Sequence, residues 1–432
     1  MHSWSVQDSW DAPEIVGAAG ASFWDSTGHR YIDMSSLAEC SNLGHQHPNI
    51  IRAIKQQADQ LCFITSEWGA EPRRALAEQL LEVSGFEGGR VFFTLAGADA
   101  NENAVKFARW ASGKPNGHVL ARSRSYHGAS NATMNYSGDP RGASYPELEH
   151  VIRVEPPLCY RCPFGYLSNQ DCQRECVRDI SQAIDNAGAD QIAAVLMESH
   201  AGTNGIVAPA DYWPALRQIC REKNIFLIAD EVMAGFGRTG TWFGWQHAGE
   251  AGRPDMMTLA KGLTGAYIPL GAVVVSEAVN AQLAGRMLYT GLTYCGHPLS
   301  CAAGLAALQT YRDEALIERS AHLGRDLFGM LAIMQKHHDI IGDVRGSGLF
   351  AIVELVKDRG TREPIVPWGV SSPVLRALVR KGREMGVSFA VRSNLIVIAP
   401  PLVITETELA QALSVLDDLL TEFSLALQAS KS

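Results

Sequence analysis

The sequence predicts an α/β fold, with a large domain built on a mostly parallel sheet and a smaller α+β domain. Between about residues 72 and 320, short apolar runs alternate with helical segments, as in a sheet covered on both faces. Polar clusters follow these runs directly. The carboxyl ends of parallel strands share one edge of a sheet, and folds of this class carry their ligand sites there. We therefore expect the polar clusters to form one site.

Two polar residues matter most. Asp230 follows the apolar run 225–229, and Lys261 follows the run 256–260. A carboxylate and an amine in one pocket suit pyridoxal phosphate (PLP), because the amine holds the aldehyde as a Schiff base and the carboxylate keeps the ring nitrogen protonated. Each residue alone also fits a surface loop or a helix cap. The other apolar runs of this region span 91–95, 119–121, 192–197 and 271–275.

The two ends of the chain have a different sequence pattern from the region between them. Residues 18–48 have the pattern of short strands, with a hairpin turn at 25–28, and Pro48 begins an amphipathic helix. Towards the C-terminus we predict a strand over 344–353, a helix over 374–386, a strand over 395–399 and a closing helix capped by Thr405 and Glu408. We divide the chain into an N-terminal segment of the small domain (1–60), a PLP-binding domain (61–325) and a C-terminal small domain (326–432).

Composition excludes several classes of protein. The net charge of −9, with both signs interspersed, lacks the basic surface of a nucleic-acid-binding protein. No apolar run reaches the length of a membrane span, and residues 1–5 lack the basic and apolar regions of a signal peptide. We expect a cytoplasmic protein that acts on small molecules.

Nine cysteines fit a reducing compartment, and four of them cluster in one segment. Cys159 and Cys162 have the spacing of a zinc-binding pair, and Cys172 and Cys176 are separated by one residue more. We predict no metal, because no paired histidine accompanies these cysteines. A structural zinc and disulfides formed in air are the alternatives.

Two further clusters become informative in combination. Residues 97–101 form a turn of small residues between a strand and a helix, where open backbone N–H groups and the helix dipole attract an anion. Tyr126 and His127 follow another apolar run, and a tyrosine at a strand end can stack on a flat ring. Many such turns bind nothing, and Tyr126 alone fits ordinary core packing.

Together these pieces resemble the class III (ω-amino acid) aminotransferases, PLP enzymes of fold type I. The resemblance runs from Gly17 to Thr405, and its most specific motif is DEVMAGFGRTG at 230–240 followed by AKG at 260–262. It implies a seven-stranded sheet and a homodimer with active sites at the interface, and dimers that pair into tetramers remain an alternative. The other matching motifs are DSTGHRYID (25–33), NLGHQHP (42–48), LAGADANENAVKFAR (95–109), SYHG (125–128), LTYCGHPLSCAAGL (292–305) and APPLVIT (399–405).

The resemblance implies a role for each matching residue. Lys261 holds the cofactor aldehyde and moves a proton between the substrate Cα and the cofactor C4′. Asp230 pairs with the ring nitrogen, while Tyr126 and Val232 cover the two faces of the ring. The remaining cofactor contacts are His127, Glu198, the backbone N–H groups of Gly97 and Ala98, and Thr293, which reaches the phosphate in the neighbouring subunit.

The substrate is indicated by Arg392. It precedes the strand at 395–399 and matches the mobile arginine of the amine, β-alanine and taurine:pyruvate group. A flexible guanidinium can clamp the carboxylate of an α-keto acid and then move away for a second substrate. CYRCPFG at 159–165 and HSWSVQ at 2–7 also look like the taurine branch. We expect amino transfer from taurine, β-alanine or a similar donor to pyruvate or 2-oxoglutarate, by ping-pong half-reactions. A surface-loop role for Arg392 is the alternative.

Three residues depart from the family pattern. Glu39, the first of them, stands where relatives usually carry an apolar or aromatic residue that lines the substrate pocket. Separately, Trp68 is a further candidate for substrate binding. A carboxylate at position 39 favours a cationic or diamine donor, unless its side chain points to solvent. Ser199 replaces a usual proline, and Ala98 replaces a usual hydroxyl residue. An aminomutase or a decarboxylase on the same fold stays open as an alternative.

Overall fold

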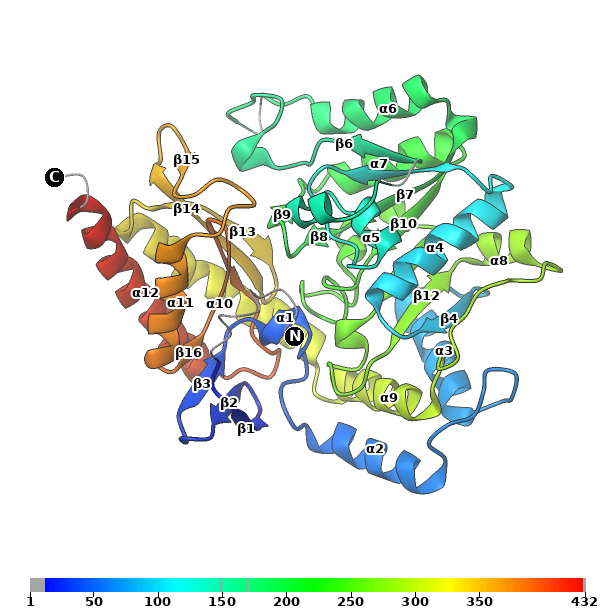
Figure 1. The fold of residues 1–432 in the computed structure, drawn as a ribbon, viewed down its shortest axis with the longest axis horizontal. Helices are drawn as coiled ribbons and strands as arrows, with labels where there is room; N and C mark the ends of the chain where they lie inside the picture. Colours follow the sequence, from blue (N-terminus) through cyan, green and yellow to red (C-terminus); the bar gives the residue numbers. More distant parts are fainter. Residues whose placement is uncertain (1–11, 148–149, 169–170, 430–432) are drawn as a thin grey trace.

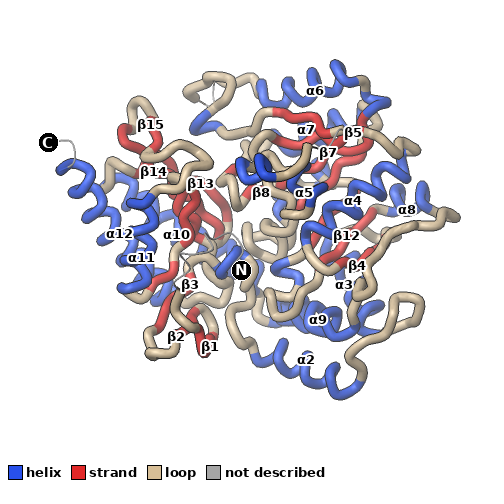
Figure 2. The backbone as a smooth tube through the Cα atoms, in the orientation of Figure 1, coloured by secondary structure: helices blue, strands red, loops and turns tan. Residues whose placement is uncertain are grey.

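The structure, a computed structural model, describes residues 12–147, 150–168 and 171–429. Its central feature is a seven-stranded sheet, and a second group of strands and helices, drawn from both ends of the chain, lies beside it (Figure 1). Helices flank the strands of the seven-stranded sheet, and in the second group the helices α11 (Pro373–Glu384) and α12 (Glu406–Ala429) lie to one side of the strands (Figure 2). The HSWSVQ segment lies outside the described residues. Every described helix is too short or too polar to cross a bilayer.

The seven-stranded sheet confirms the predicted fold class. The strand β12 runs antiparallel to both of its neighbours, and the remaining pairs are parallel. Six strands match the predicted apolar runs. The seventh, β6, was not predicted from the residues, because Val-Ile-Arg-Val at the sheet edge is short and contains a charge. In order across the sheet the strands are β4 (Arg90–Thr94), β12 (Gly271–Val275), β11 (Met256–Leu259), β10 (Phe226–Asp230), β7 (Ile192–Glu198), β5 (His118–Arg122) and β6 (Val151–Val154).

Helices cover both faces of this sheet, so its strands are apolar on both sides. On β10, Ile228 faces the core formed with α4 (Gly97–Ser112) and α8 (Glu277–Leu283), whereas Leu227 and Ala229 face the opposite core. The two-residue period of a strand explains this alternation. The opposite core includes the helices α6 (Glu175–Ala187) and α7 (Tyr212–Glu222).

The N-terminal strands pair with a strand from near the C-terminus. The antiparallel strands β2 (Ser22–Asp25) and β3 (Arg30–Asp33) confirm the predicted hairpin. Residue Ile32 of β3 pairs with Val387 in a parallel ladder. In Figure 1 these strands therefore lie beside the orange and red C-terminal helices. The sheet is completed by β1 (Ile15–Ala19) and β16 (Val387–Ser388).

The C-terminal sheet differs from the prediction at one point. The single strand expected over 344–353 is wrong, because Gly348 turns the chain between two antiparallel strands. Gly348 has a φ of +55°, and a Cβ there would lie 2.4 Å from the backbone nitrogen of Gly240. The Thr405–Glu408 capping box is confirmed. This region contains β13 (Ile341–Ser347), β14 (Phe350–Asp358), β15 (Glu363–Pro364), β17 (Ala390–Arg392), β18 (Leu395–Ile398), α10 (Leu316–His337), α11 (Pro373–Glu384) and α12 (Glu406–Ala429).

The remaining elements connect these two groups. The helix α9 packs against both α2 and α3. As predicted, α2 begins at Pro48. These elements are α1 (Ser36–Glu39), α2 (Pro48–Gln60), α3 (Glu71–Ser84), α5 (Asn131–Tyr136), β8 (His200–Ala201), β9 (Ile206–Val207) and α9 (Pro298–Asp313), with short 3₁₀ turns between several of them.

Arg238 ties the two groups together. It is fully buried, and its guanidinium donates to the carbonyl oxygens of Leu349 and Pro400. It also donates to Ser36 Oγ at 2.9 Å and Asn42 Oδ1 at 2.8 Å. Burial lowers the pKa of Arg238 to about 10, which leaves the group charged at neutral pH. One cation thus satisfies acceptors from three distant parts of the chain.

We expect Arg238→Met to lower the free energy of unfolding by about 2–5 kcal/mol, because several buried acceptors lose their donor. Urea unfolding followed by circular dichroism measures this change. The control is Arg325→Met, whose side chain is exposed on α10 and whose loss should cost under about 0.5 kcal/mol. Equal losses in the two variants would contradict the role of Arg238.

Candidate active site

A cavity of about 410 Å³ opens at the carboxyl edge of the seven-stranded sheet. Most of the predicted site residues line it, although they come from distant parts of the chain. The structure therefore brings together the clusters that follow separate strands. The predicted residues that line the cavity are Gly97, Ala98, Tyr126, His127, Glu198, Asp230, Val232 and Lys261.

Strand register explains how the central residues meet. On neighbouring parallel strands, Asp230 lies opposite Glu198 on one side and Thr258 on the other. Lys261 follows Thr258 by one short turn, so its side chain starts at the same edge. Lys261 itself has a φ of +41°, a left-handed conformation that costs a non-glycine residue free energy and is found most often at functional sites.

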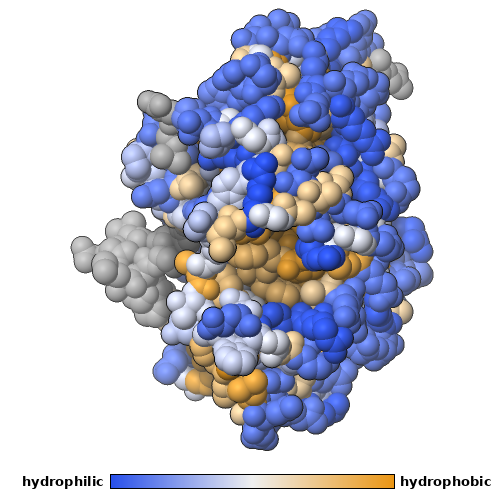
Figure 3. All heavy atoms as spheres, turned by 90° about the vertical axis from the view of Figure 1, so that its right-hand side faces the viewer, coloured by the Kyte–Doolittle hydropathy of each residue, from blue (hydrophilic) through white to orange (hydrophobic). Residues whose placement is uncertain are grey.

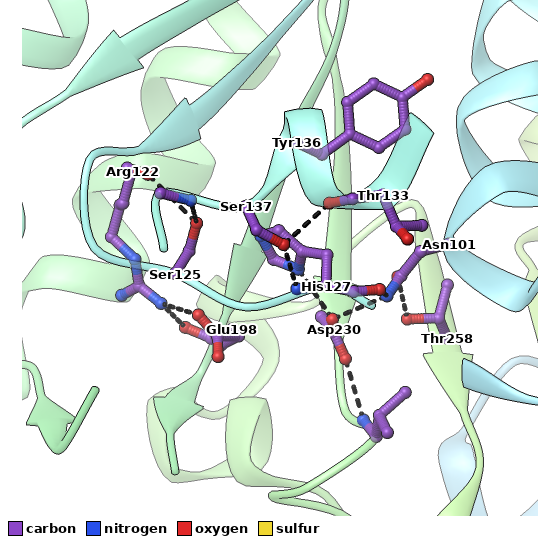
Figure 4. A network of polar contacts seen from close by, with 12 residues as sticks. Asn101, Arg122, Ser125, His127, Thr133, Tyr136, Ser137, Glu198, Asp230 and Thr258 are labelled. Carbon is purple, nitrogen blue, oxygen red and sulfur yellow. Dashed lines mark hydrogen bonds and ion pairs between the residues drawn. The ribbon is translucent and has the colours of Figure 1, made fainter. Parts of the chain in front are cut away.

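Asp230 is held by three donors. Its Oδ2 accepts from Asn101 Nδ2 at 2.8 Å and lies 2.7 Å from His127 Nδ1, and its Oδ1 accepts from the backbone N–H of Val232 at 3.0 Å. Thr258 donates to Asn101 Oδ1 at 2.7 Å and so orients the amide (Figure 4). Because Asp230 is 4% exposed, these charge-assisted bonds hold the carboxylate in one position.

Sequence reasoning missed two members of this network. Asn101 lies within the predicted anion-binding turn, but its part in positioning Asp230 was not recognised. Its place one helical turn after Gly97 was the available signal, since residues four apart share a helix face. For Thr258, the sequence offered no indication of this role except its place in an apolar run.

The start of α4 offers donors to an anion. The residue before it, Ala96, makes no side-chain capping bond, and Gly97 and Ala98 line the cavity. Backbone N–H groups in a first helical turn have no partner within the helix, and the helix dipole adds positive potential there. A Cβ at Gly97 would lie 3.0 Å from the methyl groups of Val232, so glycine keeps space beside this turn.

Two side chains suit the faces of a flat ring. Tyr126 and Val232 both line the cavity, and Val232 approaches Gly97 at the start of α4. Arg141 lies over the Tyr126 ring, with its Cζ 4.7 Å from the ring centre. Burial raises the pKa of the Tyr126 hydroxyl, so the phenol stays neutral at physiological pH.

Glu198 pairs with Arg122 at the same edge. Arg122 donates to the Glu198 carboxylate and to its backbone oxygen, both at 3.0 Å. Burial raises the pKa of Glu198, although the charges of Arg122 and His127 oppose that shift. The pair stabilises the end of β7 next to Asp230 (Figure 4).

Glu39 does not point to solvent. It is 2% exposed, and its carboxylate lies 3.2 Å from Lys261 Nζ and 3.1 Å from the guanidinium of Arg392. Burial alone raises the pKa of Glu39, but the attraction of Lys261 and Arg392 outweighs it and lowers the pKa to about 2. Arg392, on β17, is therefore an ion-paired residue near the lysine and not an isolated surface arginine.

The backbone around Glu39 is strained. Ser36, Leu37 and Glu39 have φ values of 44°, 58° and 53°, and such conformations cost about 1 kcal/mol or more each for non-glycine residues. Asp33 holds the segment by accepting from the backbone N–H groups of Ser35 and Leu37. Ser36 Oγ also donates to the carbonyl oxygen of Ala399. Surrounding contacts thus hold a costly conformation that aims Glu39 at Lys261.

Trp68 and Thr293 are not at this cavity within one chain. Trp68 is 63% exposed, and Thr293 lines a separate hollow with Arg73 and Gly296. Arg73 donates to the carbonyl oxygens of both Trp68 and Gly296, so the two segments lie together on the surface. The sequence prediction had assigned Thr293 to the cofactor of a second subunit.

The four clustered cysteines are free thiols. Among the described residues, which include all four, no three His, Cys, Asp or Glu side chains gather in a group that could hold a metal ion. Burial raises the pKa of the Cys159 thiol, and raises that of Cys176 to about 12. The geometry thus gives the zinc alternative no support.

The cavity fits PLP. A lysine amine, a buried carboxylate, an aromatic face and open N–H groups at a helix start meet the needs of its aldehyde, ring nitrogen, ring and phosphate. A carboxylate has about four acceptor positions, so Asp230 retains one for the ring N–H after its three bonds. Tyr126, Val232 and Gly97 all line this cavity, and a side chain at Gly97 would crowd Val232.

Comparisons with known proteins agree with this site. Residues 8–420 match the family described as aminotransferase class-III. A leucine/methionine racemase of Thermococcus litoralis is 36% identical, over 93% of this chain and 89% of that protein. A putrescine–pyruvate aminotransferase of Pseudomonas aeruginosa is 32% identical, over 96% and 92%. The taurine:2-oxoglutarate aminotransferase of Bifidobacterium kashiwanohense, solved with PLP and glutamate, superposes with a TM-score of 0.94 at 38% identity and covers 99% of this chain and 96% of its own.

The Glu39 ion pairs predict a pH-dependent stability of the cofactor-free protein. Because the folded-state pKa is about 2 against an ordinary value of 4.5, the stabilisation is complete above about pH 5 and decreases as the pH falls. The difference in unfolding free energy between the wild type and Glu39→Gln should therefore shrink as the pH falls from about 5 to about 2. Urea unfolding at several pH values measures it. The exposed Glu384→Gln serves as control, and an unchanged Glu39 difference would contradict the ion pairing.

Proposed function

The chain belongs to the class III aminotransferases, PLP-dependent enzymes, and we propose that it moves an amino group from a small ω-amino acid or amine to a 2-oxo acid. Taurine and β-alanine are the proposed donors, and pyruvate or 2-oxoglutarate is the proposed acceptor, in ping-pong half-reactions. The observation that carries the proposal is the contact of Glu39 with both Lys261 and Arg392. Glu39 thus links Arg392, the proposed acid-binding residue, to Lys261, the proposed reacting amine.

PLP, when bound, supplies an aldehyde that exchanges amino groups and a ring that accepts electrons. In our proposal Lys261 binds this aldehyde and its Nζ carries a proton to and from the substrate Cα. Asp230 keeps the ring nitrogen protonated, and Asn101 and His127 hold Asp230 in place. The remaining proposed contacts are Tyr126 and Val232 on the ring, Gly97 and Ala98 at the phosphate, and Glu198 beside Asp230.

Glu39 and Arg392 together let one pocket take two kinds of substrate. A 2-oxo acid brings a carboxylate, which takes the Arg392 guanidinium from Glu39 in a bidentate pair. A donor without a carboxylate at that position leaves the Glu39–Arg392 pair intact, so no buried charge loses its partner. This exchange of partners explains why the pocket contains the acid Glu39 beside Arg392, the proposed substrate-binding arginine.

A diamine donor is the second candidate function, and Glu39 is the observation that favours it. A buried carboxylate near the reacting amine can pair with the distal ammonium group of a diamine. The similarity to a putrescine–pyruvate aminotransferase supports testing this class. The similarity to a racemase makes isomerisation a reaction to test alongside amino transfer.

A donor screen tests the proposed function. The holoenzyme, given taurine, β-alanine, putrescine or a neutral amine without an acceptor, should lose the visible absorption of its cofactor. Pyruvate or 2-oxoglutarate should then restore it, and Lys261→Ala should lower turnover by at least about 10³-fold. Racemisation of leucine without loss of the absorption would instead indicate an isomerase. No change with any donor would refute amino transfer.

We also propose a homodimer in which Thr293 reaches the cofactor of the neighbouring subunit. Support comes from the segment after α8, where Met287, Tyr289, Leu292 and Tyr294 are all exposed. Figure 3 views the side of the molecule that carries α8, and apolar residues gather at its centre. Exposed apolar areas of this kind usually mark protein–protein contacts.

Sedimentation equilibrium tests the dimer. The wild type should have twice the mass of one chain, and Tyr289→Asp should dissociate it and weaken PLP retention, because burying a carboxylate in an apolar interface is costly. Leu167→Asp is the matched control, since Leu167 is comparably exposed, on a different segment. A monomeric wild type with full PLP content would contradict the proposal.

A further inference from the structure

A second cavity, of about 150 Å³, lies beside the cofactor cavity and shares Thr203 with it. Its size suits one small group. Its charged lining residues are Arg124, Arg141, Arg392 and Asp139, and Trp368 lies beside them. The affinity of this cavity for an anion therefore depends on how far each of the three cations is already neutralised within the protein.

Two of these arginines already have carboxylate partners. Arg141 makes a bidentate pair with Asp139, with both N···O distances at 2.6 Å. Arg392 pairs with Glu39. The positive charge of each is therefore largely compensated within the protein.

Arg124 is different. Its Cζ lies 4.7 Å from the centre of the Trp368 ring, and its Nε is buried without a hydrogen-bond partner. Within the described parts of the chain no carboxylate forms an ion pair with it. Glu354 attracts its charge from a distance, but that carboxylate already pairs with Arg161 and Arg345.

The burial of Arg124 is costly in the free protein. Desolvation lowers its pKa to about 10, so the group remains a cation at neutral pH. A partly buried cation without an anionic partner loses hydration that nothing in the protein replaces. An anionic ligand group in the cavity would supply the missing partner.

We propose that this cavity is a subsite for a second anionic group of the substrate, and that Arg124 determines the preference for substrates that carry one. The inference rests on the proposed function, which sets the reacting carbon at Lys261 and the first carboxylate at Arg392. The second group is then the distal carboxylate of a dicarboxylic 2-oxo acid, or the sulfonate of a sulfonated substrate. The structure thus favours 2-oxoglutarate over pyruvate as acceptor.

The competing explanation is a purely structural one, in which Arg124 only stacks on Trp368. Such a role predicts lower stability in Arg124→Met, but no change in the choice among acids. The decisive readout is therefore a ratio between two ligands and not an absolute activity.

A binding experiment tests the subsite without turnover. Isothermal titration of the holoenzyme compares glutarate with pentanoate, which has the same carbon chain but one carboxylate. We expect glutarate to bind about tenfold or more tightly, as for one added charge-assisted contact. Arg124→Met should abolish this preference and Arg124→Lys should keep part of it. The exposed Arg74→Met, which loses only a surface pair with Glu78, should retain it fully.

Equal binding of glutarate and pentanoate to the wild type would overturn the proposal, as would an unchanged preference in Arg124→Met. The titration reports on the subsite even if the donor screen finds no amino transfer, so the two failures can be told apart. A third ligand, 4-sulfobutanoate, identifies the source of the anion. Tighter binding of glutarate assigns the subsite to a carboxylate, and tighter binding of the sulfonate assigns it to a sulfonated substrate.

Steady-state kinetics provide the second readout. With one donor held constant, Arg124→Met should lower the ratio of kcat/KM for 2-oxoglutarate to that for pyruvate by about tenfold or more. Arg124→Lys should recover part of the ratio. A ratio equal to that of the wild type in Arg124→Met would contradict the assignment.

Discussion

The parallel pairing of β7, β10 and β11 is the constraint on which the site depends. Its register sets Glu198, Asp230 and Thr258 side by side, and a one-residue slip would turn each of them to the other face of the sheet. Helices on both faces prevent such a slip, because each strand buries apolar residues on both sides. The packing of the whole sheet therefore sets where Asp230 and Lys261 lie, and the contacts of each side chain then fix its orientation.

Much of this could be predicted from the sequence, because it is local. Apolar runs predict strands, and the residues after them predict the edge at which Asp230, Tyr126 and Lys261 meet. The edge strand β6 was missed because Arg153 interrupts its apolar pattern. The hairpin at Gly348 was also missed, and the close approach of this glycine to Gly240, far away in sequence, leaves no local signal. The network around Asp230 depends on Asn101 and Thr258, which meet only in the folded protein.

Glu39 shows the limit of sequence reasoning most clearly. Its position in the chain suggested the substrate pocket, but solvent exposure fitted equally well. The choice depends on the left-handed backbone at residues 36–39, which Asp33, Ala399 and Arg238 hold in place. The last two are distant in sequence, and no local pattern encodes their contribution. The same segment that carries strain also carries the acid that neutralises Arg392 and Lys261.

In our proposal, the balance of charge around the substrate gives the strained segment at residues 36–39 a function. In the cofactor-free protein without Glu39, Lys261 and Arg392 would lose their shared carboxylate partner. Arg141 would still pair with Asp139, and Arg124 would still be attracted by the more distant Glu354. Such a concentration of positive charge would favour the binding of small anions. In our proposal Arg392 exchanges partners between Glu39 and a substrate carboxylate, so Glu39 is its partner when no substrate is bound. Glu39 therefore links the strained segment at residues 36–39 to the proposed exchange at Arg392.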